Sequence, residues 1–270
     1  MTTLTAPPGP EPLERHRISP LAGLRHGLTL TWRGLVRIKH SPDRLLDVTI
    51  QPVIFIVLFV FLFGGAIAGD WHSYLQFILP GLLVQTLVFG SMGTGVNLND
   101  DISKGVFDRF RSLPIARWAP LFGSVTADVV KQVVSLLITL GFGAVLGFHF
   151  GNAGGVLAGS ALVLAFSFAI CWIFATLGLL VKSPQAVQGL AVVVVMPLTF
   201  GSNLFVKADT LPGWLQAFVQ VNPISHLISA VRGLLHGTVP TGDIAWSLIG
   251  AAAIVAVFAP LAVTIYRRRT

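Results

Sequence analysis

The sequence has few charged residues. Asp, Glu, Lys and Arg make up 11% of its 270 residues, against roughly 25% in soluble globular domains. Glutamate is almost missing, since it occurs only at Glu11 and Glu14. There is also no H-E-x-x-H pattern, so a membrane metalloprotease or another membrane-embedded hydrolase is poorly supported. The single cysteine, Cys171, excludes an intrachain disulfide and a cysteine-based metal cluster, and we interpret it as a small buried hydrophobic residue.

The ATP-binding pattern G-x-x-x-x-G-K-[ST] is absent from the sequence as well. We therefore expect no cofactor in this chain, and any ATP and Mg²⁺ that drive it would be held by a partner protein. Residues 1–19 contain several prolines but no long apolar run, so they lack the hydrophobic region of a secretory signal peptide. We expect residues 1–20 to form a disordered cytoplasmic tail.

What the sequence does contain is hydrophobic residues, at 54% of the chain, gathered in long runs. The first run, 48–68, would form about 31 Å of helix at ~1.5 Å per residue, which matches a hydrocarbon core of ~30 Å. Further runs follow at 75–98, 121–148, 156–181, 187–205 and 244–266. The fold class that we predict is an all-α polytopic membrane protein with six transmembrane helices.

The formal net charge of +7 comes from Lys and Arg residues that flank the apolar runs. Nucleic-acid binding would need such residues clustered on a folded polar face, so we expect no nucleic-acid partner. Flanking cations instead indicate orientation, because they stay on the cytoplasmic side during insertion. With Lys39 and Arg44 before the first run and Arg267 to Arg269 after the last, both termini should be cytoplasmic in a bacterial-type plasma membrane.

Residues 21–45 have the pattern of a basic amphipathic helix. Leucines recur at spacings of three and four, together with Trp32, whereas Arg25, Arg33 and Arg37 fall largely on another face. We expect this helix to lie at the cytoplasmic membrane surface, with its arginines near anionic lipid or a partner. The remainder of the chain, 46–270, would form the transmembrane domain.

Residues 210–237 are apolar in places but are interrupted by Pro212, Asn222 and Pro223. Each half is too short to span a membrane, so we predict two short helices that dip into or lie along the outer leaflet. Trp214 would sit at the interface, where aromatic rings are favoured. Arg232 would either snorkel to the outer surface, the interpretation that we favour, or line a cavity.

The loop 99–114 carries the clearest functional pattern. Asn99 or Asp100 is suited to cap the start of a short helix, and Pro114 is suited to stop it. One face of that helix would carry apolar residues and another would carry charges. Such a helix suits docking into a groove on a soluble partner, or resting on lipid headgroups.

Asp128 and Lys131 stand three residues apart near the cytoplasmic end of the third run. This spacing predicts an ion pair on one helix face. We favour that interpretation over a proton relay, because pairing reduces the cost of placing charges at membrane depth.

Segment 104–114, KGVFDRFRSLP, resembles the signature of the daunorubicin/doxorubicin-resistance permeases, a branch of the ABC-2 transporter family. Gln51-Pro52 and the segments 80–86, 183–186, 212–215 and 221–225 are similar to that family too. The resemblance runs from about Trp32 to the C-terminus. It implies a fold like that of type V ABC exporters, with an N-terminal connecting helix, a cytoplasmic coupling helix and outer re-entrant helices.

The resemblance also implies partners: a second copy of the permease and two copies of a cytoplasmic ATPase, with membrane lipid around them. Carried over to this chain, the coupling helix would contact the ATPase through Asp101, Lys104, Gly105, Phe107, Asp108, Arg109, Phe110 and Arg111. Closing of the ATPase dimer would then change the tilt of the first, second and fifth spans. The re-entrant region would include Trp214, Asn222, Pro223 and Arg232.

The expected function is export of a hydrophobic or amphipathic, drug-like molecule by a non-catalytic transport subunit. Export of a lipid, glycolipid or polysaccharide by the same architecture is the alternative. A proton-driven secondary transporter, which needs no ATPase, is a further one. Few polar residues lie within the apolar runs, which favours an amphipathic cargo over an aqueous sugar channel.

Overall fold

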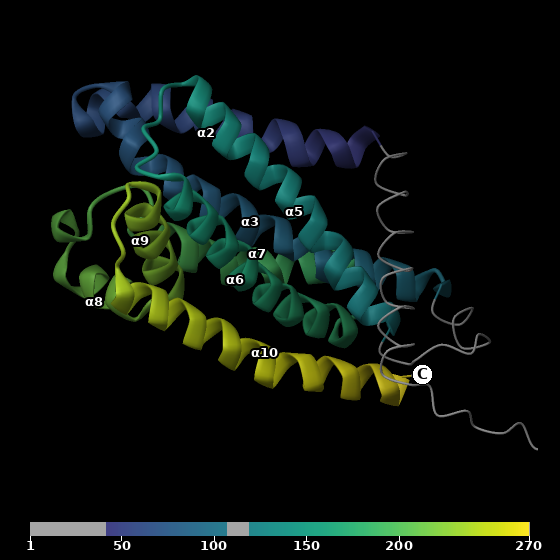
Figure 1. The fold of residues 1–270 in the computed structure, drawn as a ribbon. Helices are drawn as coiled ribbons and strands as arrows, with labels where there is room; N and C mark the ends of the chain where they lie inside the picture. Colours follow the sequence, from purple (N-terminus) through teal and green to yellow (C-terminus); the bar gives the residue numbers. More distant parts are fainter. Residues whose placement is uncertain (1–41, 107–118, 270) are drawn as a thin grey trace, which may run out of the picture.

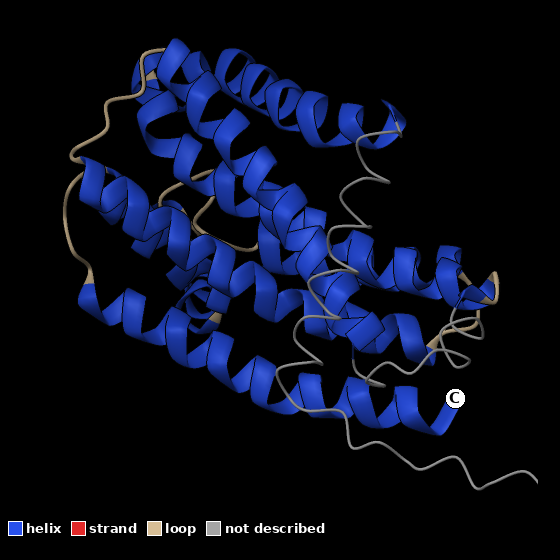
Figure 2. Ribbon diagram, turned by 45° about the vertical axis from the view of Figure 1, so that its right-hand side comes forward, coloured by secondary structure: helices blue, strands red, loops and turns tan. Residues whose placement is uncertain are grey.

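The computed structural model describes residues 42–106 and 119–269 (Figure 1). The tail 1–20 and most of the connecting helix, with Arg25, Trp32, Arg33 and Arg37, lie outside this part of the chain. So do five of the residues expected to contact an ATPase, namely Phe107, Asp108, Arg109, Phe110 and Arg111. Throughout the described ranges the regular elements are helices (Figure 2).

Within these ranges, six helices run along the length of a bundle. They are α2 (Pro42–Ala68), α3 (Trp71–Ser103), α5 (Ala119–Val145), α6 (Ala153–Leu180), α7 (Pro184–Phe200) and α10 (Thr241–Arg269). Five of them are long and apolar enough to cross a membrane, and α7, with 17 residues, is the shorter one. The all-helical class and five of the six expected spans are thereby confirmed.

Neighbouring helices along the chain alternate in direction, so α2 begins and α10 ends at the same end of the bundle (Figure 1). We call this the Ser103 end, because α3 finishes there. The opposite end carries the turn η1 (Ala208–Thr210) and the short helices α8 (Gly213–Val221) and α9 (Pro223–Leu235). We call it the α9 end. The prediction of two short helices in 210–237 is confirmed, with the break at Asn222-Pro223.

Polar residues set where several helices begin in this largely apolar chain. Asp70 accepts a hydrogen bond from the Ser73 backbone N–H at 2.8 Å and caps α3. Asn152 caps α6 and Ser183 caps α7 in the same way. Side chains of this kind satisfy N–H groups that have no partner within the helix. Helix starts are therefore encoded locally, even where hydropathy is uniform.

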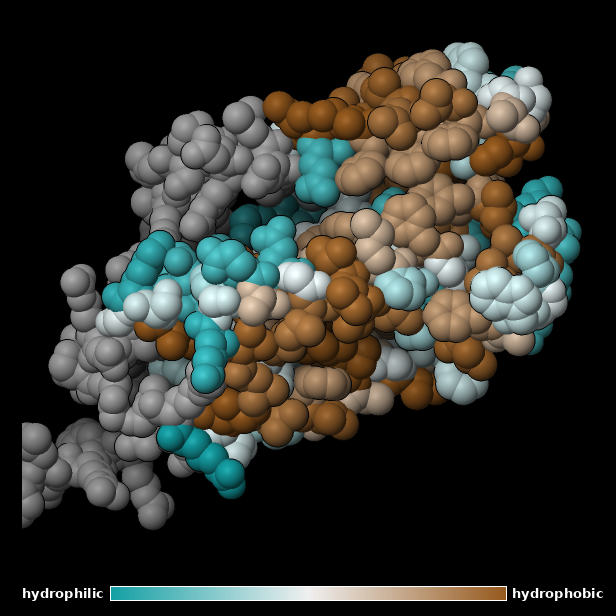
Figure 3. Space-filling model, turned by 180° about the vertical axis from the view of Figure 1, so that it is seen from behind, coloured by the Kyte–Doolittle hydropathy of each residue, from teal (hydrophilic) through white to brown (hydrophobic). Residues whose placement is uncertain are grey.

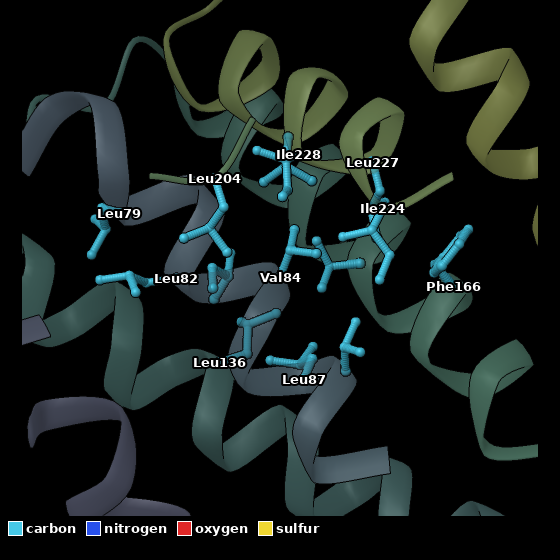
Figure 4. Packing of buried hydrophobic residues seen from close by; sticks show 14 of the residues in the cluster. Leu79, Leu82, Val84, Leu87, Leu136, Phe166, Leu204, Ile224, Leu227 and Ile228 are labelled. Carbon is cyan, nitrogen blue, oxygen red and sulfur yellow. The ribbon is translucent and has the colours of Figure 1, made fainter. Parts of the chain in front are cut away.

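The core of the bundle is built around α3 and α6. In each, 72% of the most apolar stretch is buried, against 22% for α2, 33% for α5 and 11% for α10. Figure 4 shows Val84 of α3 facing Ile224 and Ile228 of α9, with Leu87 further along α3 beside Leu136 of α5. The outer helices leave broad hydrophobic surface uncovered (Figure 3), as expected of faces that meet lipid or another membrane helix.

The prediction that a separate helix begins at Asn99 or Asp100 is wrong. α3 continues without interruption to Ser103, and the chain turns only at Gly105, whose φ is +66°. The reason is that no Gly or Pro lies between Leu98 and Ser103 to stop the helix. In addition, the Asn99 side chain bonds to another helix instead of capping a new one.

Candidate functional site

The Ser103 end of α3 is tied directly to the end of α6. The Asn99 Nδ2 group donates hydrogen bonds to the carbonyl oxygens of Gly178, at 2.8 Å, and of Val181, at 2.7 Å. Gly178 belongs to the last turn of α6 and Val181 follows directly after the helix, where carbonyl groups lack partners within the helix. Asn99 is buried, so these bonds are shielded from water. One side chain thus satisfies the end of α6 and fixes it to α3.

Two glycines bring the same helices into close contact. A Cβ atom on Gly95 would overlap with the Phe174 carbonyl, and one on Gly178 would overlap with the Gly95 carbonyl. Small residues of this kind let helix backbones approach closely in membranes. The contact lies one helical turn from Asn99 along α3. The glycines and the asparagine therefore hold α3 and α6 together just before the predicted coupling segment.

Three of the predicted coupling residues are described, and they form the end of α3. Lys104 Nζ lies 2.7 Å from Asp100 Oδ2 in an exposed i,i+4 ion pair, which contributes little stability in water. Asp101, which follows Asp100 in α3, is partly buried. Gly105 has a positive φ, a conformation open to glycine at little cost. Gly105 therefore sets the direction in which the chain leaves α3.

A polar cavity of about 420 Å³ lies between α2, α3 and α5. Gln51, Thr86 and Asn97 line it from α2 and α3, and Asp128 and Lys131 line it from α5. Figure 3 shows hydrophilic groups in a hollow beneath the uppermost helix, α2. Polar lining is uncommon among membrane helices and marks places that can bind polar groups of a solute.

Asp128 and Lys131 form the predicted ion pair on α5. The side chain of Asp128 is 7% exposed and that of Lys131 is 17% exposed. Pairing offsets part of the cost of burying each charge. Since their formal charges cancel, these two residues give the cavity strong local dipoles without net charge.

A buried polar cluster, which sequence patterns do not indicate, joins this cavity to the core. Gln132 of α5 donates to Ser91 Oγ of α3 at 3.0 Å and accepts from Ser167 Oγ of α6. The hydroxyl oxygens of Ser91 and Ser167 are 2.9 Å apart. Cys171 is fully buried, as predicted, with its sulfur 3.6 Å from Gln132 Nε2. These residues lie in different helices, far apart along the chain, so sequence periodicity could not pair them.

At the α9 end, Asn222 and Pro223 separate the two short helices. The Asn222 Nδ2 group donates to the Leu198 carbonyl at 2.7 Å, and its Oδ1 accepts from the Ile224 N–H at 3.0 Å. Asn222 therefore caps α9 and fixes it to α7. Trp214 is 75% exposed on α8. Arg232 is partly buried and lines a cavity. This is the second of the two positions considered for it, and not the extension to the outer surface that we favoured.

No set of three or more His, Cys, Asp or Glu side chains that could hold a metal ion occurs within residues 42–106 and 119–269. His226 of α9 instead pairs with Asp243 of α10, with 2.7 Å between Nδ1 and Oδ1. The polar features of the described chain are thus suited to binding and to holding helices together.

Comparison with known proteins agrees with this geometry. The ABC-2 type transporter family profile matches residues 26–236. The chain is 45% identical over 243 residues to the daunorubicin resistance ABC transporter permease protein DrrB1 of Streptomyces coeruleorubidus, covering 90% of this chain and 86% of that protein. It is 29% identical over 245 residues to the probable doxorubicin resistance permease DrrC of Mycobacterium tuberculosis, covering 89% and 88%. The putative transport permease ycf38 of Cyanophora paradoxa is 28% identical over 211 residues, covering 76% and 72%.

Proposed function

Because the chain belongs to the ABC-2 type transporter family, as a non-catalytic, multi-pass permease subunit, we propose that it exports hydrophobic or amphipathic, antibiotic-like molecules. The observation that carries this cargo class is the similarity to a daunorubicin resistance permease over nine-tenths of the chain. A separate ATPase would bind ATP and Mg²⁺, since the chain has no phosphate-binding loop of its own. Two ATPase subunits and a second permease copy complete the proposed assembly.

In this proposal the Ser103 end faces the cytoplasm. Lys39 precedes α2, Arg44 lies in the first turn of α2, and Arg267 to Arg269 end α10, so the positive-inside bias places that end inside. The α9 end then faces outward, with α8 and α9 as re-entrant helices and Trp214 at the interface. α7 completes the six spans, because 17 residues reach the lower limit for crossing a bilayer.

The ATPase contact is proposed for the segment that leaves α3 at Gly105. It comprises Asp101, Lys104, Gly105, Phe107, Asp108, Arg109, Phe110 and Arg111. The contacts of Asn99 support a role in coupling, because a displacement of this segment would act on α3 and α6 together. Force from the ATPase would thus reach the central pair of helices.

The polar cavity is the proposed position of the cargo's polar part. Asp128 and Lys131 present a negative and a positive charge to it, and the other lining residues include amides and hydroxyls as well as Phe89 and two glycines. The exposed apolar face of α2 lies beside the cavity, with Ile54 54% exposed and Leu58 44% exposed. An amphipathic molecule would place its hydrophobic part along α2, or between two permease copies. ATP drives export if the inward and outward states bind the cargo with different affinity.

The test replaces Arg109 or Phe107 with Ala and measures co-purification of the ATPase and growth on daunorubicin. Both variants should lose most of the complex and of the resistance. Arg117→Ala, in the same loop but outside the motif, is the matched control and should behave as wild type. Unchanged complex and resistance in both motif variants would remove the coupling assignment. If the wild-type complex transports a lipid or polysaccharide but no drug, the proposed cargo class is wrong and the proposed ATPase contact is unaffected.

A further inference from the structure

Another cavity, of about 640 Å³, lies at the α9 end between the end of α2, the start of α3 and the segment before α8. Its polar lining includes Gln76, Lys207, Arg232 and His236. Its apolar lining includes Ile67 and Phe77. The proposed coupling and cargo sites lie on other parts of the bundle and use none of these residues.

The Arg232 guanidinium is held in place by neutral groups. Its Nε donates to the Phe77 carbonyl at 3.2 Å, and its Nη2 donates to the Asn203 carbonyl at 2.9 Å. Its Cζ lies 4.0 Å from the centre of the Phe77 ring, at a distance typical of cation–π contacts. A guanidinium has five N–H donors in a fixed fork. Two bonds to carbonyls leave the rest of the fork available toward the cavity.

The side chains that line the cavity carry positive charge, and no described carboxylate is among them. Among the described residues, no Asp or Glu lines it and none forms an ion pair with Arg232. The closest acidic residues along the chain to its lining are Asp70, which caps α3, and Asp209, which is exposed. Lys207 is exposed and adds a second cation to the cavity. A buried cation without a counter-ion is costly, and an anionic ligand would offset that cost.

The surroundings of the cavity are hydrophobic and exposed. Ile67 at the end of α2 is 45% exposed, and Trp71 at the start of α3 is 40% exposed. Trp71 packs against Phe61, with 5.3 Å between ring centres, which extends the apolar surface along α2. A ligand that suits both parts has an anionic head and a hydrocarbon tail.

We propose that this cavity binds the phosphate group of an anionic phospholipid. The Arg232 fork and the Lys207 ammonium hold the phosphate, and the acyl chains lie beside Ile67 and Trp71 at the α9 end, away from the part of α2 that lines the polar cavity. The lipid site uses neither the cargo cavity nor the ATPase contact, so its test is independent of the test of the proposed function. Its role is to fix the α9 end in the membrane by joining α3, α9 and lipid.

The experiment uses the full-length protein, purified in detergent and stripped of lipid. Dioleoylphosphatidylglycerol, dioleoylphosphatidylcholine or inorganic phosphate is added, and bound lipid is measured by native mass spectrometry. The wild type should retain phosphatidylglycerol in preference to phosphatidylcholine. Lys207→Gln should weaken that binding about fivefold, as expected for one cation near a charged lipid. Arg232→Lys, which keeps the charge but removes the fork, should weaken it further.

Lys182→Gln is the matched control, since Lys182 is exposed and lies between α6 and α7 at the Ser103 end. It should bind phosphatidylglycerol as the wild type does. Equal retention of both lipids, or no change in Lys207→Gln and Arg232→Lys, overturns the proposal. If millimolar inorganic phosphate displaces phosphatidylglycerol, the cavity binds anions but its ligand is free phosphate and not a phospholipid, which overturns the proposal. If Arg232→Lys does not fold, Lys207→Gln decides the question alone.

Discussion

Replacing Asn99 with Leu should uncouple ATP hydrolysis from transport while leaving the protein folded. The substitution removes the two hydrogen bonds from Nδ2 to the Gly178 and Val181 carbonyls and keeps a side chain of similar size. At ~0.5–1.5 kcal/mol per bond, the loss is about 1–3 kcal/mol. This is small against a typical folding free energy of ~5–15 kcal/mol. The same loss is large for the coupling between two sites, because 1–3 kcal/mol changes an equilibrium constant by a factor of about 5–150.

The assay reconstitutes the permease with its ATPase and measures three quantities: complex yield, ATP hydrolysis and ATP-dependent uptake of daunorubicin into inverted vesicles. Asn99→Leu should keep the first two and lose uptake by at least about fivefold. Ser103→Ala is the control, because the Ser103 hydroxyl bonds only within α3, to the Asp100 carbonyl at 2.8 Å. Normal uptake by Asn99→Leu would refute the idea that the α3–α6 link carries the force. Loss of the complex itself would show that Asn99 acts on assembly.

Further predictions concern packing, charge and topology. Gly178→Ala should lower the melting temperature, because the added Cβ would overlap with the Gly95 carbonyl. The control Gly189→Ala should melt as the wild type does, because open space surrounds Gly189. Asp128→Asn should destabilise the protein in chemical unfolding by less than the ~3–5 kcal/mol of a fully buried pair, because it leaves the partly buried Lys131 ammonium without its partner. Adding Lys131→Met should recover much of that loss. In a cysteine-free background, Gly69→Cys should react with an impermeant maleimide on intact cells and Ser183→Cys should not; the reverse labelling would invert the proposed orientation.

Much of the fold follows from properties that a single sequence records. Apolar runs long enough to cross a membrane mark the helices, and side chains such as Ser183 mark where they begin. The pairing of Asp128 with Lys131 is also local, because i,i+3 residues share a helix face in any fold. The five long apolar helices and the Asp128–Lys131 pair depend on residues close together in the chain, so a single sequence predicts them correctly.

The errors concern contacts between distant segments. Asparagine is a residue type that often caps helices, yet the Asn99 side chain donates hydrogen bonds to carbonyls about 80 positions further along the chain. Arg232 has the length to reach the surface, but its guanidinium is held by Phe77 and Asn203. Ser91, Gln132 and Ser167 meet only because three helices pack together. One sequence does not record which helix faces meet, so none of these contacts could be predicted.

The contacts of α3 limit how this permease can change conformation. The family resemblance implies that closing of the ATPase dimer changes the tilt of the first, second and fifth spans, which are α2, α3 and α7. However, α3 is joined to α6 by the Asn99 bonds, by the Gly95–Gly178 contact and by the Ser91–Ser167 pair. α3 cannot tilt alone without breaking buried polar contacts, which is costly in a membrane. By contrast, only 22% of the apolar stretch of α2 is buried. We therefore expect α3 and α6 to move as one unit against α2, which would open or close the polar cavity between them.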